Sequence, residues 1–251
     1  MLLTPQELED FNKNGFIVLR NFLEEKKCDK ILEVAKKHLN EKIAPFETEF
    51  DYIGKDKQTL KESIRRLRQV YNRDKVFQSW MKHKKIRPIL KQILNESPVL
   101  ITAHHNSIMT KQPHTSTQTQ WHQDFRYWSY ENDKLVSVWL ALGEENSNNG
   151  VLEFIPKSHT MKFSSEQFIE KEYFSSLNSQ NISLIKTTVS TTLYKGDIVL
   201  FHCKLLHRAN ENSTNMTKIS FVYTVKGEFN KVIEHTRSSQ FKEIKLDNII
   251  V

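Results

Sequence analysis

Two stretches of the chain carry the pattern that decides the fold: Trp121-His122-Gln123-Asp124, and later Gly196-Asp197-Ile198-Val199-Leu200-Phe201-His202-Cys203-Lys204-Leu205-Leu206-His207. In a β-strand, residues i and i+2 point to the same face of the sheet. His122 and Asp124 are therefore predicted to present an imidazole and a carboxylate side by side.

The second stretch offers two candidates for a third ligand, His202 and His207. Either one would complete a set of two imidazoles and one carboxylate. This set binds one face of a ferrous ion and leaves the other positions open, as in non-haem Fe(II) oxygenases. The sequence therefore predicts a mononuclear iron site with room for a cosubstrate and dioxygen.

The distribution of apolar runs predicts a mainly β fold with an α-helical layer. Residues 1–96 are expected to be mostly helical, with helices at 5–13 and 24–42 and a short strand at 16–19. After residue 97 the periodicity changes, and a helix and loop are expected at 164–181, at the mouth of a barrel. Roughly eight short antiparallel strands suggest a jelly roll. They are expected at residues 99–109, 117–124, 135–142, 151–155, 183–192, 197–201, 205–209 and 217–225.

The charge of the chain is concentrated in one segment. The whole chain carries +7, but residues 55–91 hold thirteen Lys or Arg residues against three acidic residues, a local net charge of +10. Apolar residues recur there at helical spacing (Leu60, Ile64, Leu67 and Tyr71; Ile86, Ile89, Leu90 and Ile93), which predicts amphipathic helices with basic outer faces. These faces are either simply solvated or form a rim that attracts an anionic substrate. Nucleic acid is the weaker candidate, because the aromatic residues are not interleaved as a stacking platform requires.

Length and composition fit one domain over residues 1–251: a helical part (1–96), a jelly-roll core (97–226) and a C-terminal extension (227–251). A hydrophobic content of 38% in 251 residues suffices to bury a substantial core. No apolar run is long enough to span a bilayer, and no signal-peptide core is visible. The two cysteines, Cys28 and Cys203, suit a reducing compartment, so a cytoplasmic protein is expected.

The motifs as a set resemble the phytanoyl-CoA dioxygenase family. In that family W-H-Q-D is followed by a strand with a tryptophan (here Trp139), by N-G-x-L-x-x-x-P-G-S-H (here Asn149–His159), and by G-D-x-x-x-F-H with a second histidine. The opening residues 3–19 are also similar. The resemblance implies a cupin-like barrel, also called a double-stranded β-helix. It further implies an enzyme that uses Fe(II), 2-oxoglutarate and dioxygen to hydroxylate a small organic substrate.

The resemblance also implies roles for individual residues. His207 becomes the third metal ligand with His122 and Asp124, and His202 becomes structural. Lys218 stands where the family has an arginine, eleven residues after the distal histidine, to pair with the far carboxylate of 2-oxoglutarate; lysine lacks the bidentate fork of arginine. Cosubstrate contacts are also expected from Ser220, Trp139 and Gln123.

The roles expected for four further residues are less closely tied to the chemistry. Arg126 and Tyr127, which follow the metal motif, are expected to line the substrate entrance, where Arg126 would meet an anionic group. Lys111 matches a family K-x-P motif and is expected to be structural, and Arg68 is the closest match to a basic residue near the cosubstrate. Two alternatives stay open: a barrel that binds a ligand without turnover, and a nucleic-acid-directed oxygenase.

Overall fold

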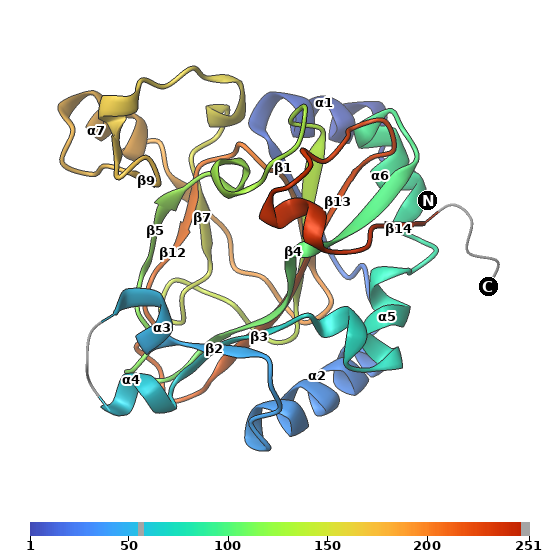
Figure 1. Ribbon diagram of the computed structural model, residues 1–251, viewed down its shortest axis with the longest axis vertical. Coiled ribbons are helices and arrows are strands. Elements are labelled where there is room, and N and C mark those ends of the chain that lie inside the picture. Colours follow the sequence, from blue (N-terminus) through green and yellow to red (C-terminus); the bar gives the residue numbers. More distant parts are fainter. Residues whose placement is uncertain (55–57, 247–251) are drawn as a thin grey trace.

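A computed structural model describes residues 1–54 and 58–246; residues 55–57 of the basic segment and 247–251 of the predicted extension lie outside the described residues. Within the described part, two antiparallel sheets face each other (Figure 1). The larger sheet has the order β1 (Phe16–Leu19), β11 (Ile198–His202), β6 (Leu135–Ala141), β13 (Lys218–Gly227), β4 (Pro98–Lys111), β3 (Ile64–Arg68) and β2 (Phe46–Thr48), with β14 (Ile244–Lys245) paired to β4. The smaller sheet has the order β10 (Val189–Ser190), β7 (Leu152–Phe154), β12 (His207–Ala209), β5 (Thr119–His122), β9 (Tyr173–Phe174) and β8 (Phe168–Ile169). The predicted jelly-roll class is confirmed.

Strand β13 shows how the larger sheet separates two environments. Phe221 and Tyr223 belong to the apolar core that the sheet shares with the helices. Val222 lies between them in sequence and packs instead in the core between the two sheets, with Trp139 of β6. Because side chains alternate along a strand, Lys218 and Ser220 share the inner face with Val222. The polar residues of β13 are thereby directed into the barrel.

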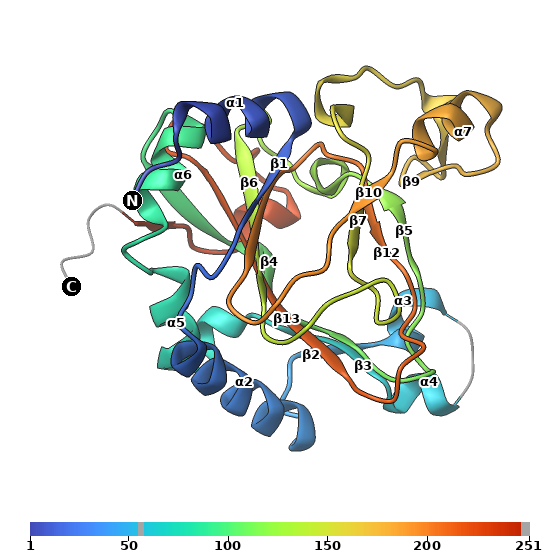
Figure 2. The same cartoon turned by 180° about the vertical axis from the view of Figure 1, so that it is seen from behind.

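The helices cover the outer face of the larger sheet. They are α1 (Pro5–Asn14), α2 (Glu25–Asn40), α5 (Lys75–Met81) and α6 (Arg87–Leu94), and Figure 2 shows them along one side of the molecule. The side chain of Thr4 caps α1 together with Glu7, and Gly15 ends it in the left-handed conformation with φ of 84°. The helices predicted near 5–13 and 24–42 are confirmed.

The prediction of helix for residues 64–68 was wrong. Helix α4 (Gln58–Glu62) ends before Ile64, and Ile64–Arg68 forms β3 between β2 and β4. The spacing of Leu60, Ile64 and Leu67 fits a helix, but pairing with β4 satisfies the backbone and still buries Leu67 in the helix-side core. Arg66 and Arg68 pair with Met109 and Ser107 and flank Leu67, so they share the opposite face, toward the barrel interior.

The strand predicted at 183–192 was also wrong over most of its length. Residues 179–185 form α7 (Ser179–Ile185), and only Val189 and Ser190 pair as β10. The Asn178 side chain caps α7 by accepting from the Gln180 backbone N–H, and the buried Asn181 amide donates to the Gln167 and Ser175 carbonyl groups. This local capping stabilises the helix where apolar content alone suggested a strand. The segment predicted as helix and loop at 164–181 contains the short β8–β9 hairpin as well.

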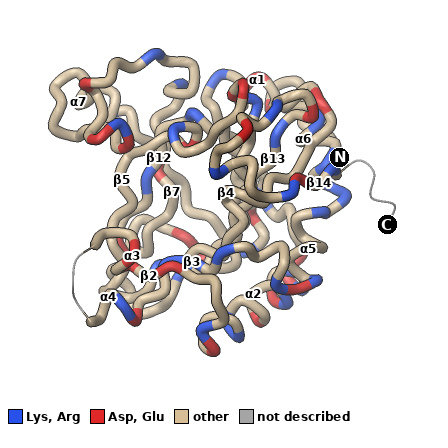
Figure 3. The backbone as a smooth tube through the Cα atoms, viewed as in Figure 1, with Lys and Arg blue, Asp and Glu red and all other residues tan. Residues whose placement is uncertain are grey.

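The basic residues are spread over much of the structure. Figure 3 shows Lys and Arg on the helices and at strand ends around the described chain, with acidic residues among them, rather than on one continuous face. The short helix α3 (Glu49–Ile53) carries the acidic Glu49, which is buried. The search for a bilayer-spanning helix in the described residues found none that is long and apolar enough.

Candidate active site

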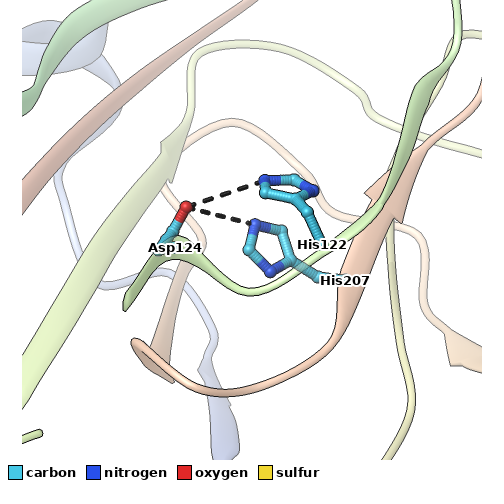
Figure 4. A group of neighbouring side chains, drawn as sticks. All are labelled: His122, Asp124 and His207. Carbon is cyan, nitrogen blue, oxygen red and sulfur yellow. Dashed lines mark ion pairs between the residues drawn. The ribbon is translucent and has the colours of Figure 1, made fainter. Parts of the chain in front are cut away.

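The structure brings His122, Asp124 and His207 together at one end of the smaller sheet (Figure 4). His122 ends β5 and His207 begins β12, and the two are register partners on these antiparallel strands. Asp124 begins the turn that follows β5. One ligand atom from each of the three residues lies within 4.8 Å of the others, so one ion could contact all three.

Hydrogen bonds orient both imidazoles toward the aspartate. Each Nδ1 lies next to a backbone carbonyl two residues earlier: 2.8 Å from Gln120 O for His122, and 2.9 Å from Leu205 O for His207. A carbonyl only accepts, so each Nδ1 carries the proton and each Nε2 keeps a free lone pair. The two Nε2 atoms lie 3.6 and 3.8 Å from Asp124 Oδ1. The free lone pairs and the carboxylate therefore converge on one point.

The electrostatics favour the forms that bind metal. Burial alone would raise the pKa of the Asp124 carboxyl, but His105, His207 and His122 outweigh it and hold that pKa well below its usual range. Burial, with His122 next to it, lowers the pKa of His207 to about 3. At neutral pH the cluster thus offers a carboxylate and a neutral buried imidazole, which are the protonation states that a metal requires.

A fourth histidine contacts this cluster. His105 Nε2 lies 2.7 Å from Asp124 Oδ1, and Ser137 Oγ donates to Oδ2 of the same carboxylate at 3.3 Å. His105 lies at an irregularity in β4 and has a positive φ of 29°, which turns its side chain toward the aspartate. His105 is not among the site residues expected from the sequence. The signal that could have identified it is the His104-His105 pair inside an otherwise apolar strand, because two imidazoles there need polar partners.

His202, the second candidate for the third ligand, does not join the cluster. Its Nδ1 accepts from the Lys204 backbone N–H at 3.1 Å, and its ring packs on His159 at 5.2 Å between centroids. His159 in turn lies 3.1 Å from Asn12 O and close against Gly15. His202 and His159 therefore lie between the barrel and α1, and neither belongs to the group formed by His122, Asp124 and His207.

Two cavities adjoin the cluster. The inner cavity, of about 60 Å³, is lined by His122, His207, Trp139, Lys218, Lys111 and others. The outer cavity, of about 220 Å³, is lined by His105, His122, Asp124, Tyr127, Arg68, Arg237 and others. The two cavities adjoin, because His122 and His105 line both, together with Arg65, Met109 and Thr119. Asp124 lines only the outer cavity and His207 only the inner one, so an ion bound by the three residues would lie where the two cavities meet.

The predicted cosubstrate cation, Lys218, is buried and already paired. Its Nζ lies 3.3 Å from Glu145 Oε2 and 2.7 Å from Gly150 O, and the exposed fraction of its side chain is 3%. Glu145 also accepts from Ser220 Oγ at 2.7 Å and from Trp139 Nε1 at 3.1 Å. Three of the residues predicted to contact the cosubstrate therefore share one internal carboxylate. Nothing in the sequence marks Glu145 as a site residue, because it stands in an Asn-rich loop where an acidic residue is ordinarily solvated.

Lys111, predicted to be structural, lines the inner cavity beside Lys218. Its Nζ donates to Thr117 O at 2.5 Å. Burial, with Arg65 and Lys218 close by, lowers the pKa of Lys111 to about 7, and Glu49 and Glu211 act in the opposite direction. Glu49 itself pairs with Arg65 at 3.0 Å.

The outer cavity is rich in arginine. Arg66 pairs with Glu47 at 2.6 Å, whereas Arg68 and Arg237 have no ion pair among the described residues. Burial lowers the pKa of Arg237, and the nearby Arg68 and Arg66 add to this shift. The nearby Glu47 acts in the opposite direction. Arg66, Arg68 and Arg237 all line this one cavity. Arg237 belongs to the predicted C-terminal extension, which thus contributes to the cavity wall.

The remaining predicted residues are placed differently from one another. Tyr127 lines the outer cavity, with its ring 6.4 Å from that of His122. Arg126 instead stacks on Phe168 at 3.2 Å and donates to a backbone carbonyl of the β8–β9 segment. Gln123 is buried, donates to Lys204 O at 2.6 Å and accepts from Arg126, and it lines neither cavity within the described chain.

Comparisons with known proteins agree with this geometry. Residues 11–220 match the family model described as phytanoyl-CoA dioxygenase (PhyH). The chain is 23% identical to phytanoyl-CoA dioxygenase domain-containing protein 1 of Bos taurus, covering 88% of this chain and 89% of that protein. It is 25% identical to a probable alpha-ketoglutarate-dependent hypophosphite dioxygenase of Stutzerimonas stutzeri, covering 86% of this chain and 76% of that protein.

A solved structure shares the fold. The epimerase SnoN, crystallised with Fe3+, alpha ketoglutarate and nogalamycin RO, superposes with a TM-score of 0.75 at 14% identity, covering 96% of this chain and 93% of that one. The identity is too low to transfer individual residues, but the fold likeness extends over nearly the whole chain. Because the family model spans most of the sequence and the His-Asp-His cluster is assembled, the chain belongs to the phytanoyl-CoA dioxygenase family of non-haem iron, 2-oxoglutarate-dependent oxygenases.

Proposed function

We propose that this protein is an Fe(II)- and 2-oxoglutarate-dependent dioxygenase that hydroxylates a small organic substrate carrying an anionic group. The observation that carries the proposal is the placement of His122, Asp124 and His207 between an inner and an outer cavity. An oxygenase of this kind needs one compartment for the cosubstrate and another for the substrate, both in contact with the same ion.

The three side chains fit a ferrous ion. Two neutral imidazoles and one carboxylate are the ligand types that it takes in such enzymes, and the three ligand atoms lie within 4.8 Å of one another. With Fe(II), 2-oxoglutarate and dioxygen bound, the chemistry supplied is oxidative decarboxylation of 2-oxoglutarate to succinate and carbon dioxide, coupled to insertion of one oxygen atom into a C–H bond.

The inner cavity is assigned to the cosubstrate. It extends from the two histidines to Lys218 and is walled by Trp139, whose indole ring lies 5.1 Å from the Lys218 Nζ. Ser220 contributes by holding the carboxylate that pairs with this lysine. We propose no direct cosubstrate contact for Gln123, since its amide is bonded to a backbone carbonyl and to Arg126.

The outer cavity is assigned to the substrate, and its charge specifies an anion. Arg68 and Arg237 form no ion pair in the described chain, and the Glu47 carboxylate that lines the same cavity is paired with Arg66. A carboxylate or phosphate group would relieve their repulsion and form charge-assisted hydrogen bonds. With the anion held there, the remainder of the substrate would extend past Tyr127 toward the metal cluster.

The enzyme reaction is tested by succinate formation. Purified protein with Fe(II), 2-oxoglutarate and oxygen should release succinate slowly without substrate, and Asp124→Ala should release none. His202→Gln is the matched control, since His202 lies outside the cluster, and it should retain the wild-type rate. Equal succinate release by wild type and Asp124→Ala would contradict the proposal and favour a barrel that only binds ligands.

The substrate class is tested by a screen. Small carboxylates and phosphate esters should stimulate 2-oxoglutarate consumption, whereas neutral analogues of the same size should not. Arg237→Ala should lose this stimulation by about tenfold or more while keeping the substrate-independent rate. Stimulation by neutral compounds that is unaffected by Arg237→Ala would exclude an anion site at these arginines.

A further inference from the structure

Two lysines face each other in the inner cavity. Lys111 at the end of β4 and Lys218 at the start of β13 are direct register partners, and both line this cavity. Directly opposed residues in an antiparallel pair have Cβ atoms about 5 Å apart. Both side chains are nearly inaccessible to solvent, with 6% and 5% of each residue exposed. Like charges at such positions repel each other unless carboxylates compensate them.

Only one of the two ammonium groups is compensated within the described chain. Glu145 accepts from Lys218, and Gly150 O accepts a second hydrogen bond from the same Nζ, so this ammonium is directed to the loop between β6 and β7. Lys111 donates to a single backbone carbonyl, that of Thr117, and no described carboxylate lies within ion-pair distance of its Nζ.

The charges that line the inner cavity indicate that one carboxylate is missing from it. Three pairs at this cavity are neutral: Arg65 with Glu49, Lys218 with Glu145, and Arg208 with Glu153. Glu211 acts on Lys111 from a distance, without forming an ion pair with it among the described residues. Lys111 remains with a charge of +1 when protonated. A buried cation without a partner costs several kcal/mol, whereas one carboxylate in the same cavity would remove that cost. The 2-oxoglutarate molecule brings one such carboxylate at the end that does not bind the metal.

We propose that Lys111, rather than Lys218, is the cation that pairs with the distal carboxylate of the cosubstrate, and that Glu145 holds Lys218 as a neutralised part of the cavity wall. The inference rests on the proposed function, since it requires the inner cavity to hold 2-oxoglutarate. Lys111 would then select ketoacids that carry a distal carboxylate. Glu145 would neutralise Lys218 in place of a second carboxylate from the cosubstrate. Lys218 then differs from the family arginine in residue type and in being paired with a carboxylate of the protein itself.

The test compares two ketoacids that differ only at the distal end. Pyruvate has the same metal-binding group as 2-oxoglutarate but no distal carboxylate. Dissociation constants for both are measured by calorimetry on Fe(II)-loaded protein without oxygen, at pH 7. Wild type should bind 2-oxoglutarate more tightly than pyruvate. Lys111→Met should weaken 2-oxoglutarate binding by about tenfold or more and leave pyruvate binding unchanged.

The matched variant removes the other lysine together with its counter-ion. Glu145→Leu/Lys218→Met should keep the preference for 2-oxoglutarate, because it leaves the charge of the cavity at +1. Loss of the preference in this double variant, or its retention in Lys111→Met, would overturn the proposal. A wild-type protein that binds both ketoacids equally would overturn it as well. If wild type binds neither, the proposed function itself fails, which is a different result.

A rescue experiment separates pairing from a merely structural role. In Lys111→Met/Glu145→Gln, Lys218 loses its counter-ion and becomes the free cation of the cavity. The preference for 2-oxoglutarate that Lys111→Met removes should then return at least in part. If Lys111 were only structural, removing the Glu145 carboxylate from a different loop would not restore the preference for 2-oxoglutarate. A folded double variant that does not regain this preference would therefore count against the proposal.

Discussion

Removing the Glu145 carboxylate should destabilise the protein strongly, and removing its partner as well should restore most of the loss. The carboxylate accepts from Lys218 Nζ at 3.3 Å, from Ser220 Oγ at 2.7 Å and from Trp139 Nε1 at 3.1 Å, and it is fully buried. Glu145→Leu leaves the buried ammonium with the single acceptor Gly150 O. The structure therefore isolates one ion pair whose two halves can be deleted separately or together.

The expected magnitude follows from the distance and the burial. At 3.3 Å, two unit charges in a protein of effective dielectric constant about 20 attract each other by about 5 kcal/mol. Breaking a buried pair by removing one partner typically costs about 3–5 kcal/mol. For a chain of this length that corresponds to a decrease in melting temperature of about 10 °C. In Glu145→Leu/Lys218→Met the neutral donors of Ser220 and Trp139 lose their acceptor and Gly150 O loses its donor, at about 1 kcal/mol each.

The assay is a double-mutant cycle on metal-free protein at pH 7. Free energies of unfolding from urea denaturation are compared for wild type, the two single variants and the double variant. We expect a coupling energy of about 2–3 kcal/mol, with the double variant more stable than Glu145→Leu alone. Additive effects of the two substitutions would refute the argument, since they would mean that the ammonium group finds solvent instead of the carboxylate.

Three further predictions concern the residues around the cluster. His105→Ala should weaken Fe(II) binding by about 10- to 100-fold in competition with a chelator, because His105 orients the Asp124 carboxylate; unchanged affinity would exclude that role. Burial lowers the pKa of folded Lys111 to about 7, below its unfolded value, so wild type should gain stability relative to Lys111→Met as pH rises from about 7 to about 10. A stability difference that stays constant over this range in urea titrations would contradict the shift. Gly150→Ala should cost about 2 kcal/mol or more, because Gly150 has φ of 80° and an added Cβ would lie 2.4 Å from Asn210 O; a melting temperature within about 2 °C of wild type would refute it.

The metal cluster could be predicted from the sequence because it depends on short-range rules. His122 and Asp124 follow the alternation of a strand, and the pairing of β5 with β12 brings His207 opposite His122. The choice of His207 over His202 needed the family resemblance, since both stand close to the end of the same apolar run. Local spacing thus predicts two of the three side chains, and the third depends on which strands pair.

The strand β3 shows where periodicity fails. Ile64 and Leu67 suit a helix by spacing, and the same residues suit a strand that packs against β4 and the helix-side core. Local sequence cannot distinguish the helix from the strand, because the strand forms by pairing with the edge of β4. The residues of β4 are distant from β3 in the sequence. The consequence for function is large: a helix would point Arg66 and Arg68 in different directions, whereas the strand directs both toward the barrel.

Glu145 and Lys111 could not be assigned from the sequence for a related reason. A lysine in a strand and a glutamate in a polar loop are ordinarily solvated, and nothing local marks them as buried. Only the closure of the barrel makes them neighbours of Lys218, and only then does their charge have a cost. The family resemblance placed a cation at Lys218, and its side chain is buried inside the barrel, where Glu145 neutralises it. The number of uncompensated charges in the inner cavity is therefore a property of the assembled fold, and it determines which lysine is left to bind a ligand.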